Sequence, residues 1–172
     1  FHAIKQRWRD EVSASDFLRD PGLSMTEARE WTLNALIALA QRQFAIAGFP
    51  EYLGGTGPQS ESVAHFEMLA HGDLSLTIKS GVQHGLFGGA IVNLGTTWHH
   101  ETFLPDVISV KLPGCFGMTE LDHGSDVQSI ETTITYLPDT DELEVQGGLD
   151  LVEGVLALGL AGACHPVGAA TC

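Results

Sequence analysis

The chain has 172 residues, 44% of them hydrophobic, which is enough to bury a core. Its 22 acidic and 8 basic residues give a formal net charge of −14, which repels phosphate backbones and argues against nucleic acid as a partner. The apolar stretch 151–163 contains Glu153 and is too short to span a bilayer, so no membrane insertion is predicted. Three widely spaced cysteines lack metal or redox spacing, so we expect reduced thiols in a cytoplasmic protein.

The basic residues are concentrated near the start of the chain. Five of the eight lie within the first thirty positions, and none follows Lys111, whereas ten acidic residues do. A domain that binds several phosphates normally supplies more cations than this. We therefore expect either that backbone N–H groups and helix ends bind any phosphate, or that the phosphate-binding portion is absent.

Local signals predict helices over the first hundred residues, after a polar lead-in with one short helix. Ser24 and Glu27 have the spacing of a capping box, so a long helix should begin there and continue to about Ala47. Further helices are predicted near 60–72, 73–94 and 97–104, the last of them halted by Pro105. The residues expected to face inward are Trp31, Ala35, Leu36, Leu39, Ala40 and Phe44 in the first long helix, and Val63, Phe66, Leu69 and Ala70 in the next.

The predicted helix over 73–94 carries two stripes of residues spaced four apart. One stripe is apolar, and the other consists of Gly81, Gly85 and Gly89. Each glycine costs about 1 kcal/mol relative to alanine inside a helix, so the stripe needs a reason. Close approach of another helix is the favoured reason, and contact with a cofactor is the alternative. The apolar stripe consists of Leu74, Ile78, Val82 and Leu86.

The periodicity changes after Pro105. Residues 108–118 are predicted to form a strand in which Cys115 is a small buried residue, and 130–136 alternate as in a second extended segment. A turn over 137–141 and a returning strand from Leu143 follow. The predicted fold class is therefore α+β. The expected domains are a helical domain over 1–107, the start of an antiparallel β domain over 108–146, and an atypical Gly/Ala-rich tail over 147–172.

The densest polar cluster, 119–126, follows the first predicted strand. Such a loop presents N–H groups and hydroxyls that suit a polarised heteroaromatic ring or an anionic oxygen. A metal-dependent hydrolase is an alternative, but no metal site is predicted, because adjacent histidines on a helix point in different directions. His65, His71 and His84 are expected to be surface or satisfied polar residues. The metal-ligand candidates weighed were His99, His100 and Glu101, and separately Glu120, Asp122, His123 and Asp126.

Several motifs resemble acyl-CoA oxidases and dehydrogenases. The segment Gly114-Cys-Phe-Gly-Met-Thr-Glu-Leu-Asp-His-Gly-Ser-Asp126 resembles their flavin loop, and Ile130-Glu-Thr-Thr-Ile-Thr-Tyr136 is similar to the stretch that follows it in the oxidases. The pairs Gly54-Gly55 and Gly95-Thr96 resemble parts of their helical domain. The likeness extends over about 3–145, with its motifs in the family's order. It implies a helical domain followed by the start of an antiparallel β domain, as in acyl-CoA dehydrogenase-like proteins.

The resemblance implies FAD-dependent oxidation of acyl-CoA to trans-2-enoyl-CoA in fatty acid β-oxidation, with dioxygen as acceptor. FAD would be the cofactor and acyl-CoA the substrate, and Ser125 would lie near both. The family's dimers and tetramers imply a homo-oligomer. The residues that would bind the cofactor are Phe116, Met118, Thr119, Gly124 and Ser125.

Two departures from the family limit what carries over. Asp122 replaces a glycine of the loop and adds bulk and charge beside the flavin. From Gly147 onward the sequence no longer resembles the family, whose catalytic glutamate lies in a later helical domain. We therefore assign no catalytic residue and expect a truncated chain that is inactive alone. The alternative is a non-catalytic relic, or a helical interaction partner of a full-length relative.

Overall fold

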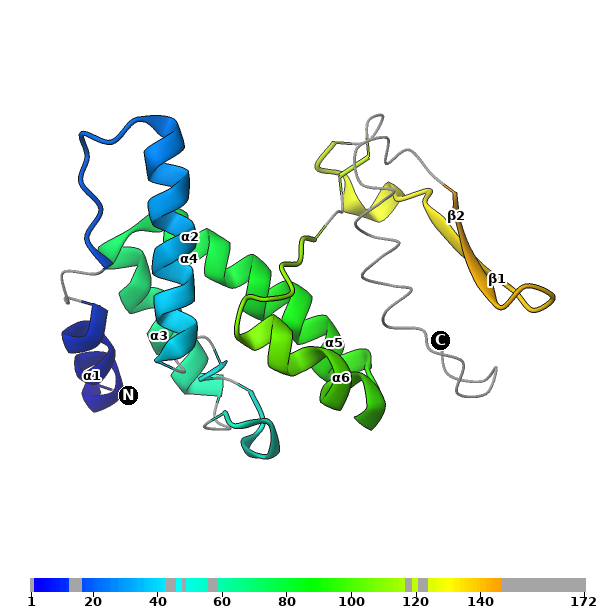
Figure 1. The fold of residues 1–172 in the computed structure, drawn as a ribbon, viewed down its shortest axis with the longest axis horizontal. Helices are drawn as coiled ribbons and strands as arrows, with labels where there is room; N and C mark the ends of the chain where they lie inside the picture. Colours follow the sequence, from blue (N-terminus) through cyan, green and yellow to red (C-terminus); the bar gives the residue numbers. More distant parts are fainter. Residues whose placement is uncertain are drawn as a thin grey trace. The chain divides into compact units, whose positions relative to one another are not determined.

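The computed structural model describes residues 2–12, 17–42, 46–47, 49–55, 59–116, 119–120 and 124–146. The chain divides into two compact units, Phe1–Pro113 and Gly114–Cys172, called here the helical unit and the second unit (Figure 1). The domain limits drawn from the sequence stay predictions, and the tail over 147–172 lies outside the described residues.

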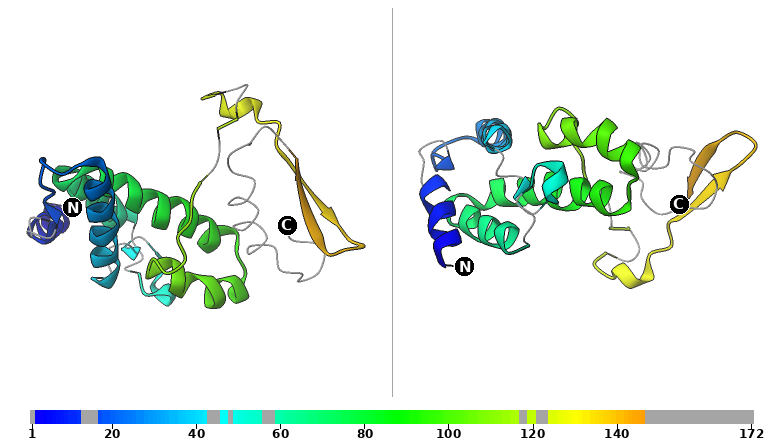
Figure 2. Two further views of the ribbon diagram at one scale, coloured as in Figure 1. Left: turned by 45° about the horizontal axis from the view of Figure 1, so that its top comes forward. Right: turned by 90° about the horizontal axis from the view of Figure 1, so that it is seen from below.

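The helical unit consists of helices joined by short connections. Three of its segments, α4, η4 and α5, follow one another without a break and form one rod (Figures 1 and 2). The helix predicted over 73–94 is therefore confirmed, although its centre, η4, has π-helical hydrogen bonding. The bounds are α1 His2–Val12, α2 Met25–Gln41, the 3-10 turn η3 Glu51–Leu53, α3 Gln59–Gly72, α4 Leu74–Ser80, η4 Gly81–Gly88, α5 Gly89–Leu94 and α6 Thr97–Ile108.

The start of α2 confirms the predicted capping box. The Ser24 hydroxyl accepts a hydrogen bond from the Glu27 N–H at 3.4 Å, and the Ser24 N–H donates to the Glu27 carboxylate at 2.8 Å. The helix ends at Gln41, earlier than the predicted Ala47. The Arg42 N–H is shared between carbonyls three and four residues back, as in a tightened last turn.

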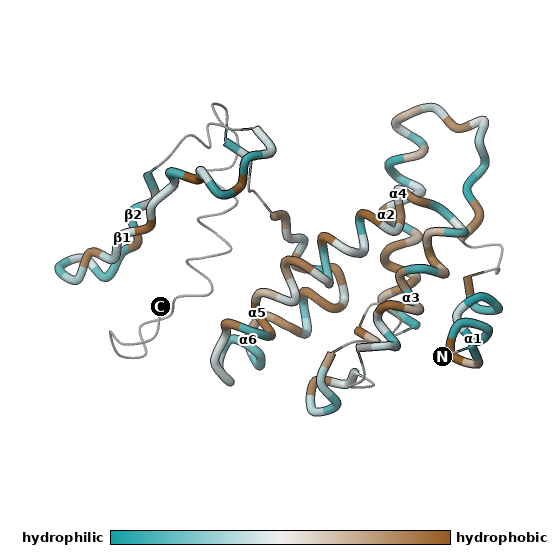
Figure 3. Tube along the Cα trace, turned by 180° about the vertical axis from the view of Figure 1, so that it is seen from behind, coloured by the Kyte–Doolittle hydropathy of each residue, from teal (hydrophilic) through white to brown (hydrophobic). Residues whose placement is uncertain are grey.

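Among the described residues, buried apolar side chains of the helical unit form three groups. Figure 3 shows hydrophobic residues along all of its helices. The largest joins the end of α1 to α2, α3 and α4 and contains Ala35, Leu36 and Leu39 of α2; Ala40 is also buried. A second group joins α5, α6 and the loop near η3, and a third joins α1 to α3. The largest group consists of Val12, Phe17, Ala35, Leu36, Leu39, Leu69 and Leu76.

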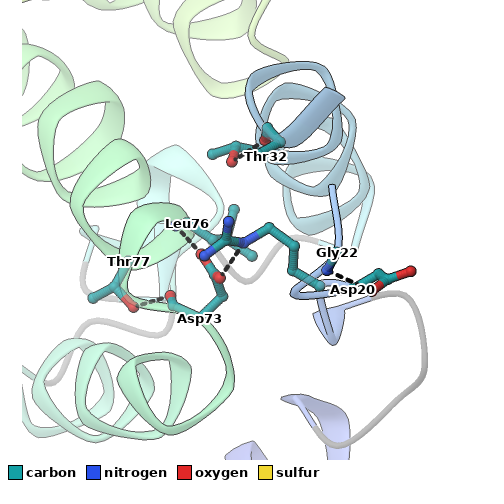
Figure 4. Close-up of polar contacts among 8 residues, drawn as sticks. Asp20, Gly22, Thr32, Asp73, Leu76 and Thr77 are labelled. Atoms are coloured by element: carbon teal, nitrogen blue, oxygen red, sulfur yellow. Dashed lines mark hydrogen bonds and ion pairs between the residues drawn. The ribbon is translucent and has the colours of Figure 1, made fainter. Parts of the chain in front are cut away.

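A buried carboxylate, Asp73, fixes the start of α4 (Figure 4). Its Oδ1 accepts the Leu76 N–H at 2.8 Å, its Oδ2 accepts Arg19 Nε at 2.8 Å, and its carbonyl accepts the Thr77 hydroxyl at 2.8 Å. Burial raises the pKa of Asp73, but the bonds from Arg19 and Leu76 outweigh it, so the pKa lies below its usual value. The carboxylate is therefore held in its charged form.

The buried face of α3 differs from the predicted one. Leu69 is fully buried, as predicted, but Val63 and Phe66 are 50% and 44% exposed, and Ala70 is also exposed. The reason is α1, which packs along α3. Trp8 Nε1 donates to Glu61 at 3.0 Å, and this contact turns a different side of α3 inward. The residues that α3 buries are Glu61, Ala64, His65, Met68 and Leu69.

The two stripes of the α4–η4–α5 rod also differ from expectation. In the apolar stripe, Leu74, Ile78 and Leu86 are 65%, 57% and 45% exposed. In the glycine stripe, a Cβ on Gly81 would lie 2.9 Å from Cε2 of Phe66 in α3, so close helix approach is confirmed there. A Cβ on Gly85 would meet nothing within 4 Å. Close approach therefore explains Gly81 and not Gly85.

Two predictions for the region after residue 104 are wrong: that Pro105 ends the helix, and that a strand follows it. Helix α6 passes through Pro105 and ends at Ile108, and residues 109–116 form turns and irregular backbone. Gln83 of η4 donates from Nε2 to the carbonyls of Val107 and Leu112, each at 2.9 Å. This side chain joins the last turn of α6 to Leu112, which stabilises a turn here rather than an extended strand. Cys115, expected to be buried, is exposed.

The second unit contains an antiparallel hairpin, as the sequence predicts. Strand β1, Thr133–Leu137, pairs with β2, Glu142–Gln146, from Thr133 opposite Gln146 to Leu137 opposite Glu142. A 3-10 turn, η5 Val127–Ser129, precedes β1. A helical amino-terminal part followed by a small antiparallel sheet confirms the predicted fold class. Within the described residues, the helices fall short of the length and apolarity of a membrane span.

Candidate functional site

The structure describes four of the five residues predicted to contact a flavin. Phe116 is 47% exposed, and Thr119, Gly124 and Ser125 are also exposed. Met118 lies outside the described residues, and so do Asp122 and His123. The polar side chains predicted to face a ligand are therefore at the surface of the second unit, where a ligand can reach them.

Gly124 gives this loop its turn. Its φ of +54° lies in the left-handed region, which favours glycine over residues with a Cβ. Its N–H donates to the Glu120 carbonyl at 3.0 Å, while a Cβ at this position would meet nothing within 4 Å. Backbone conformation, rather than lack of room, therefore requires glycine here, and the space beside its backbone is open.

Glu120 is buried, at 4% exposure. Its Oε2 accepts the Glu131 N–H at 3.0 Å, and its Oε1 accepts the Thr132 N–H at 2.8 Å and the Thr132 hydroxyl. The two donor residues stand directly before β1. From the sequence, Glu120 was considered as a metal ligand and was rejected as the catalytic base. Its true contacts lie 11 and 12 positions ahead, and no local periodicity indicates them.

The described loop residues fit the ring of a flavin better than its phosphates. An aromatic side chain, two exposed hydroxyls and an open glycine backbone suit a flat heteroaromatic ring. By sequence, however, the second unit contains no lysine or arginine. Phosphates bound at this unit would therefore depend on backbone N–H groups.

The helical unit contains a cavity of about 740 Å³ between α3 and the α4–η4–α5 rod. The described residues that line it include none of the predicted flavin-contacting residues and no Lys, Arg, Asp or Glu. Its polar groups include two buried imidazoles, His65 and His84. The wall also contains Phe49, Phe66, Ile78, Val82, Leu86 and Val92.

Burial lowers the pKa of both imidazoles of this cavity. Burial, and to a lesser extent the neighbouring His84, lower the pKa of His65 from 6.5 to about 4. Burial also lowers the pKa of His84, although hydrogen bonds to the backbone of Ile108 and Ser80 oppose the shift. His84 Nε2 lies 3.2 Å from the Ile108 carbonyl. Of the two expected alternatives, a surface or a satisfied polar residue, His71 is the first, whereas His84 is buried and has the Ile108 contact of the second; His65 is buried.

The adjacent histidines of α6 have separate structural contacts. His99 accepts the Thr96 N–H at its Nδ1 at 3.0 Å and so caps the start of the helix. His100 Nε2 lies 3.1 Å from the carbonyl of Ile91 in α5. In the part of the chain that the structure describes, no three His, Cys, Asp or Glu side chains gather as metal ligands. His99 and His100 therefore each have a contact that stabilises the start of α6 or its packing on α5.

The family model that matches this chain lies within the helical unit. Residues 14–111 match the family model of the acyl-CoA dehydrogenase, N-terminal domain. The peroxisomal acyl-coenzyme A oxidase 2 of Arabidopsis thaliana is 37% identical over 143 residues, which are 83% of this chain and 20% of that protein. Acyl-coenzyme A oxidase 3 of Yarrowia lipolytica is 37% identical over 128 residues, 72% of this chain and 18% of that protein. The chain thus spans about a fifth of these relatives.

Solved structures show the same fold. Acyl-CoA oxidase 1 from Yarrowia lipolytica superposes with a TM-score of 0.64 at 25% identity, covering 85% of this chain and 21% of that one. A glutaryl-coenzyme A dehydrogenase superposes with a TM-score of 0.62 at 22% identity, covering 85% and 37%, which shows the fold alone. Because the family model covers more than half of the sequence and the fold agrees, this chain belongs to the acyl-CoA oxidase and dehydrogenase family and carries its amino-terminal domain.

Proposed function

We propose that this chain contributes to the flavin-dependent oxidation of acyl-CoA to trans-2-enoyl-CoA, a step of fatty acid β-oxidation. The observation that carries the proposal is the exposed loop of the second unit, in which Thr119 and Ser125 flank the left-handed Gly124. The oxidase names of the relatives support dioxygen as the acceptor. The sequence of the loop and of 130–136 supports the same assignment.

FAD is the proposed cofactor, and when bound it supplies the redox chemistry. Phe116, Met118, Thr119, Gly124 and Ser125 are proposed to hold its ring system. Ser125 is also proposed to lie near the acyl-CoA. The exposed hydroxyls of Thr119 and Ser125 can donate or accept hydrogen bonds, which orients a ring or a thioester.

The chain is proposed to be inactive alone. Oxidation of an acyl-CoA needs a base that removes the α-proton, and we assign that role to no residue described here. Glu120, the carboxylate next to the loop, uses both oxygens on the backbone before β1. A homo-oligomer remains a proposal from the family. The cytoplasmic location stays a prediction, and the name of the Arabidopsis relative favours the peroxisome instead.

A non-catalytic role as a helical interaction partner is the second candidate. The exposed side chains of Leu74, Ile78 and Leu86 on the α4–η4–α5 rod favour it, because exposed apolar side chains that gather on one helix face often mark a contact surface. This role would need neither a flavin nor a base.

Purified chain distinguishes the two candidates. The first predicts bound FAD with a flavin absorption spectrum, and no peroxide from acyl-CoAs of any length unless the rest of a family enzyme is supplied. A chain that stays colourless and binds no added FAD, yet associates with a full-length relative, would support the second candidate and overturn the first.

A further inference from the structure

One residue, Glu120, makes hydrogen bonds to two separate parts of the second unit. Glu120 stands at the beginning of the segment that leads to Gly124 and Ser125, and its carboxylate accepts three hydrogen bonds from Glu131 and Thr132 at the entrance to β1. Its own carbonyl accepts the Gly124 N–H. Glu120 therefore touches both the turn of the loop and the strand that follows it.

The described contacts suit a carboxylate. Among the described residues, two N–H groups and one hydroxyl donate to its two oxygens, and bonds from donors to a charged acceptor are stronger than neutral ones. A glutamine keeps the shape of the side chain but turns an NH₂ group towards at least one N–H. At 4% exposure, that unmatched pair has little access to water.

We propose that Glu120 is the positioning residue of the flavin loop. Its carboxylate binds the residues before β1 and its carbonyl binds the Gly124 N–H, so that Thr119 and Ser125 keep the placement in which they meet the flavin. The inference rests on the proposed function and extends it to a residue that does not itself touch the cofactor.

The alternative roles for this side chain fit the contacts less well. A metal ligand or a general base needs an oxygen lone pair that faces the ligand or the substrate. Both oxygens of Glu120 instead face main-chain and hydroxyl donors of the same unit. The neighbouring Thr119, in contrast, is exposed. Buried Glu120 therefore stabilises the loop, and exposed Thr119 is the residue that can contact a ligand.

The test uses the whole 172-residue chain in four forms, the wild type and three variants. Glu120→Gln removes the charge at the loop, and Glu120→Asp keeps the charge on a shorter side chain. Glu142→Gln, at the exposed start of β2, removes one charge from the same unit and serves as the matched control. The readouts are hydrogen exchange of the Glu131 and Thr132 amides without flavin, and the dissociation constant and visible circular dichroism of added FAD.

We expect Glu120→Gln to speed exchange at both amides and to weaken FAD binding, each by about tenfold, the ratio that corresponds to one lost hydrogen bond to a charged group. Glu120→Asp should restore part of both effects, and Glu142→Gln should match the wild type. Far-UV circular dichroism checks that the helical unit stays folded in every form.

The outcomes separate this inference from the proposed function. If the wild type binds FAD and Glu120→Gln binds it equally well with the same exchange rates, the positioning role is wrong and the function stands. If exchange speeds up in Glu120→Gln but the wild type binds no FAD, Glu120 orders the loop and the flavin function is wrong, so that its role towards a flavin falls too. Equal effects of Glu120→Gln and Glu142→Gln would show a charge effect only and would also overturn the role.

Discussion

Arg19 donates a hydrogen bond from Nε to Oδ2 of Asp73 over 2.8 Å, although 54 positions separate the two residues. The other oxygen of the same carboxylate caps α4 through the Leu76 N–H. One buried side chain therefore joins the segment before α2 to the start of the rod that crosses the helical unit. The position of α4 relative to α2 depends on this carboxylate as well as on apolar packing.

Asp73→Ala should lower the free energy of unfolding by about 2 kcal/mol, because it removes both the cap and the bond to Arg19. Asp73→Asn keeps an oxygen for the cap and should cost about 1 kcal/mol, since Arg19 is partly exposed and solvent screens its charge. Urea denaturation followed by far-UV circular dichroism measures both. Asp20→Asn, at an exposed position, is the control and should change little. An unchanged midpoint for Asp73→Ala would refute this account of α4.

Acid should destabilise the helical unit through His65. Its pKa is about 4 in the folded chain and 6.5 when solvated, so the unfolded state binds more protons between these values. The contribution of neutral, buried His65 to the free energy of unfolding is fully present above pH 6.5. It is lost as the pH falls from 6.5 towards 4, by up to about 3 kcal/mol. Unfolding free energies at intervals from pH 7.5 to 4.5 measure the slope.

The matched variants for this slope are His65→Gln and His71→Gln. The first removes the buried titrating group and should flatten the pH dependence, whereas the second changes an exposed imidazole and should leave it as in the wild type. If His65→Gln keeps the full slope, burial of His65 is not its source.

Two glycines of the rod should respond differently to alanine. Gly85→Ala meets open space and should stabilise the helix by up to about 1 kcal/mol. Gly81→Ala gains the same helix propensity but places its Cβ 2.9 Å from the Phe66 ring, which must move, so it should be the less stable of the two. Thermal melts of both, with and without Phe66→Ala, give the comparison. The difference should vanish in the Phe66→Ala background, and its persistence there would contradict the packing at Gly81.

The sequence predicts those parts of the fold that depend on neighbours along the chain. The capping box of Ser24 and Glu27 and the hairpin around Leu137 are of this kind, because their hydrogen bonds span three to thirteen positions. The buried face of α3 was wrong because α1, through Trp8, decides which side is covered. The strand expected after Pro105 was wrong because Gln83, far back in the chain, binds the carbonyls of Val107 and Leu112.

In the candidate site, too, some features could be predicted from the sequence and others could not. Motif resemblance indicated the exposed residues Phe116, Thr119, Gly124 and Ser125, whose chemistry is visible in their residue types. The role of Glu120 was not visible, because it depends on donors that only the folded loop brings to its carboxylate. The flavin contacts of these exposed residues remain a proposal, which FAD binding to the chain and its variants tests directly.

The most direct test is an equilibrium titration of the 172-residue chain with FAD, followed by flavin fluorescence, for the wild type and Thr119→Val. We predict saturable binding near one FAD per chain, and binding about tenfold weaker for Thr119→Val, because an exposed hydroxyl that meets the ring is lost without disturbing the fold. Wild-type chain that folds, as judged by its helical circular dichroism, and leaves FAD fluorescence unchanged at every concentration would contradict the central claim.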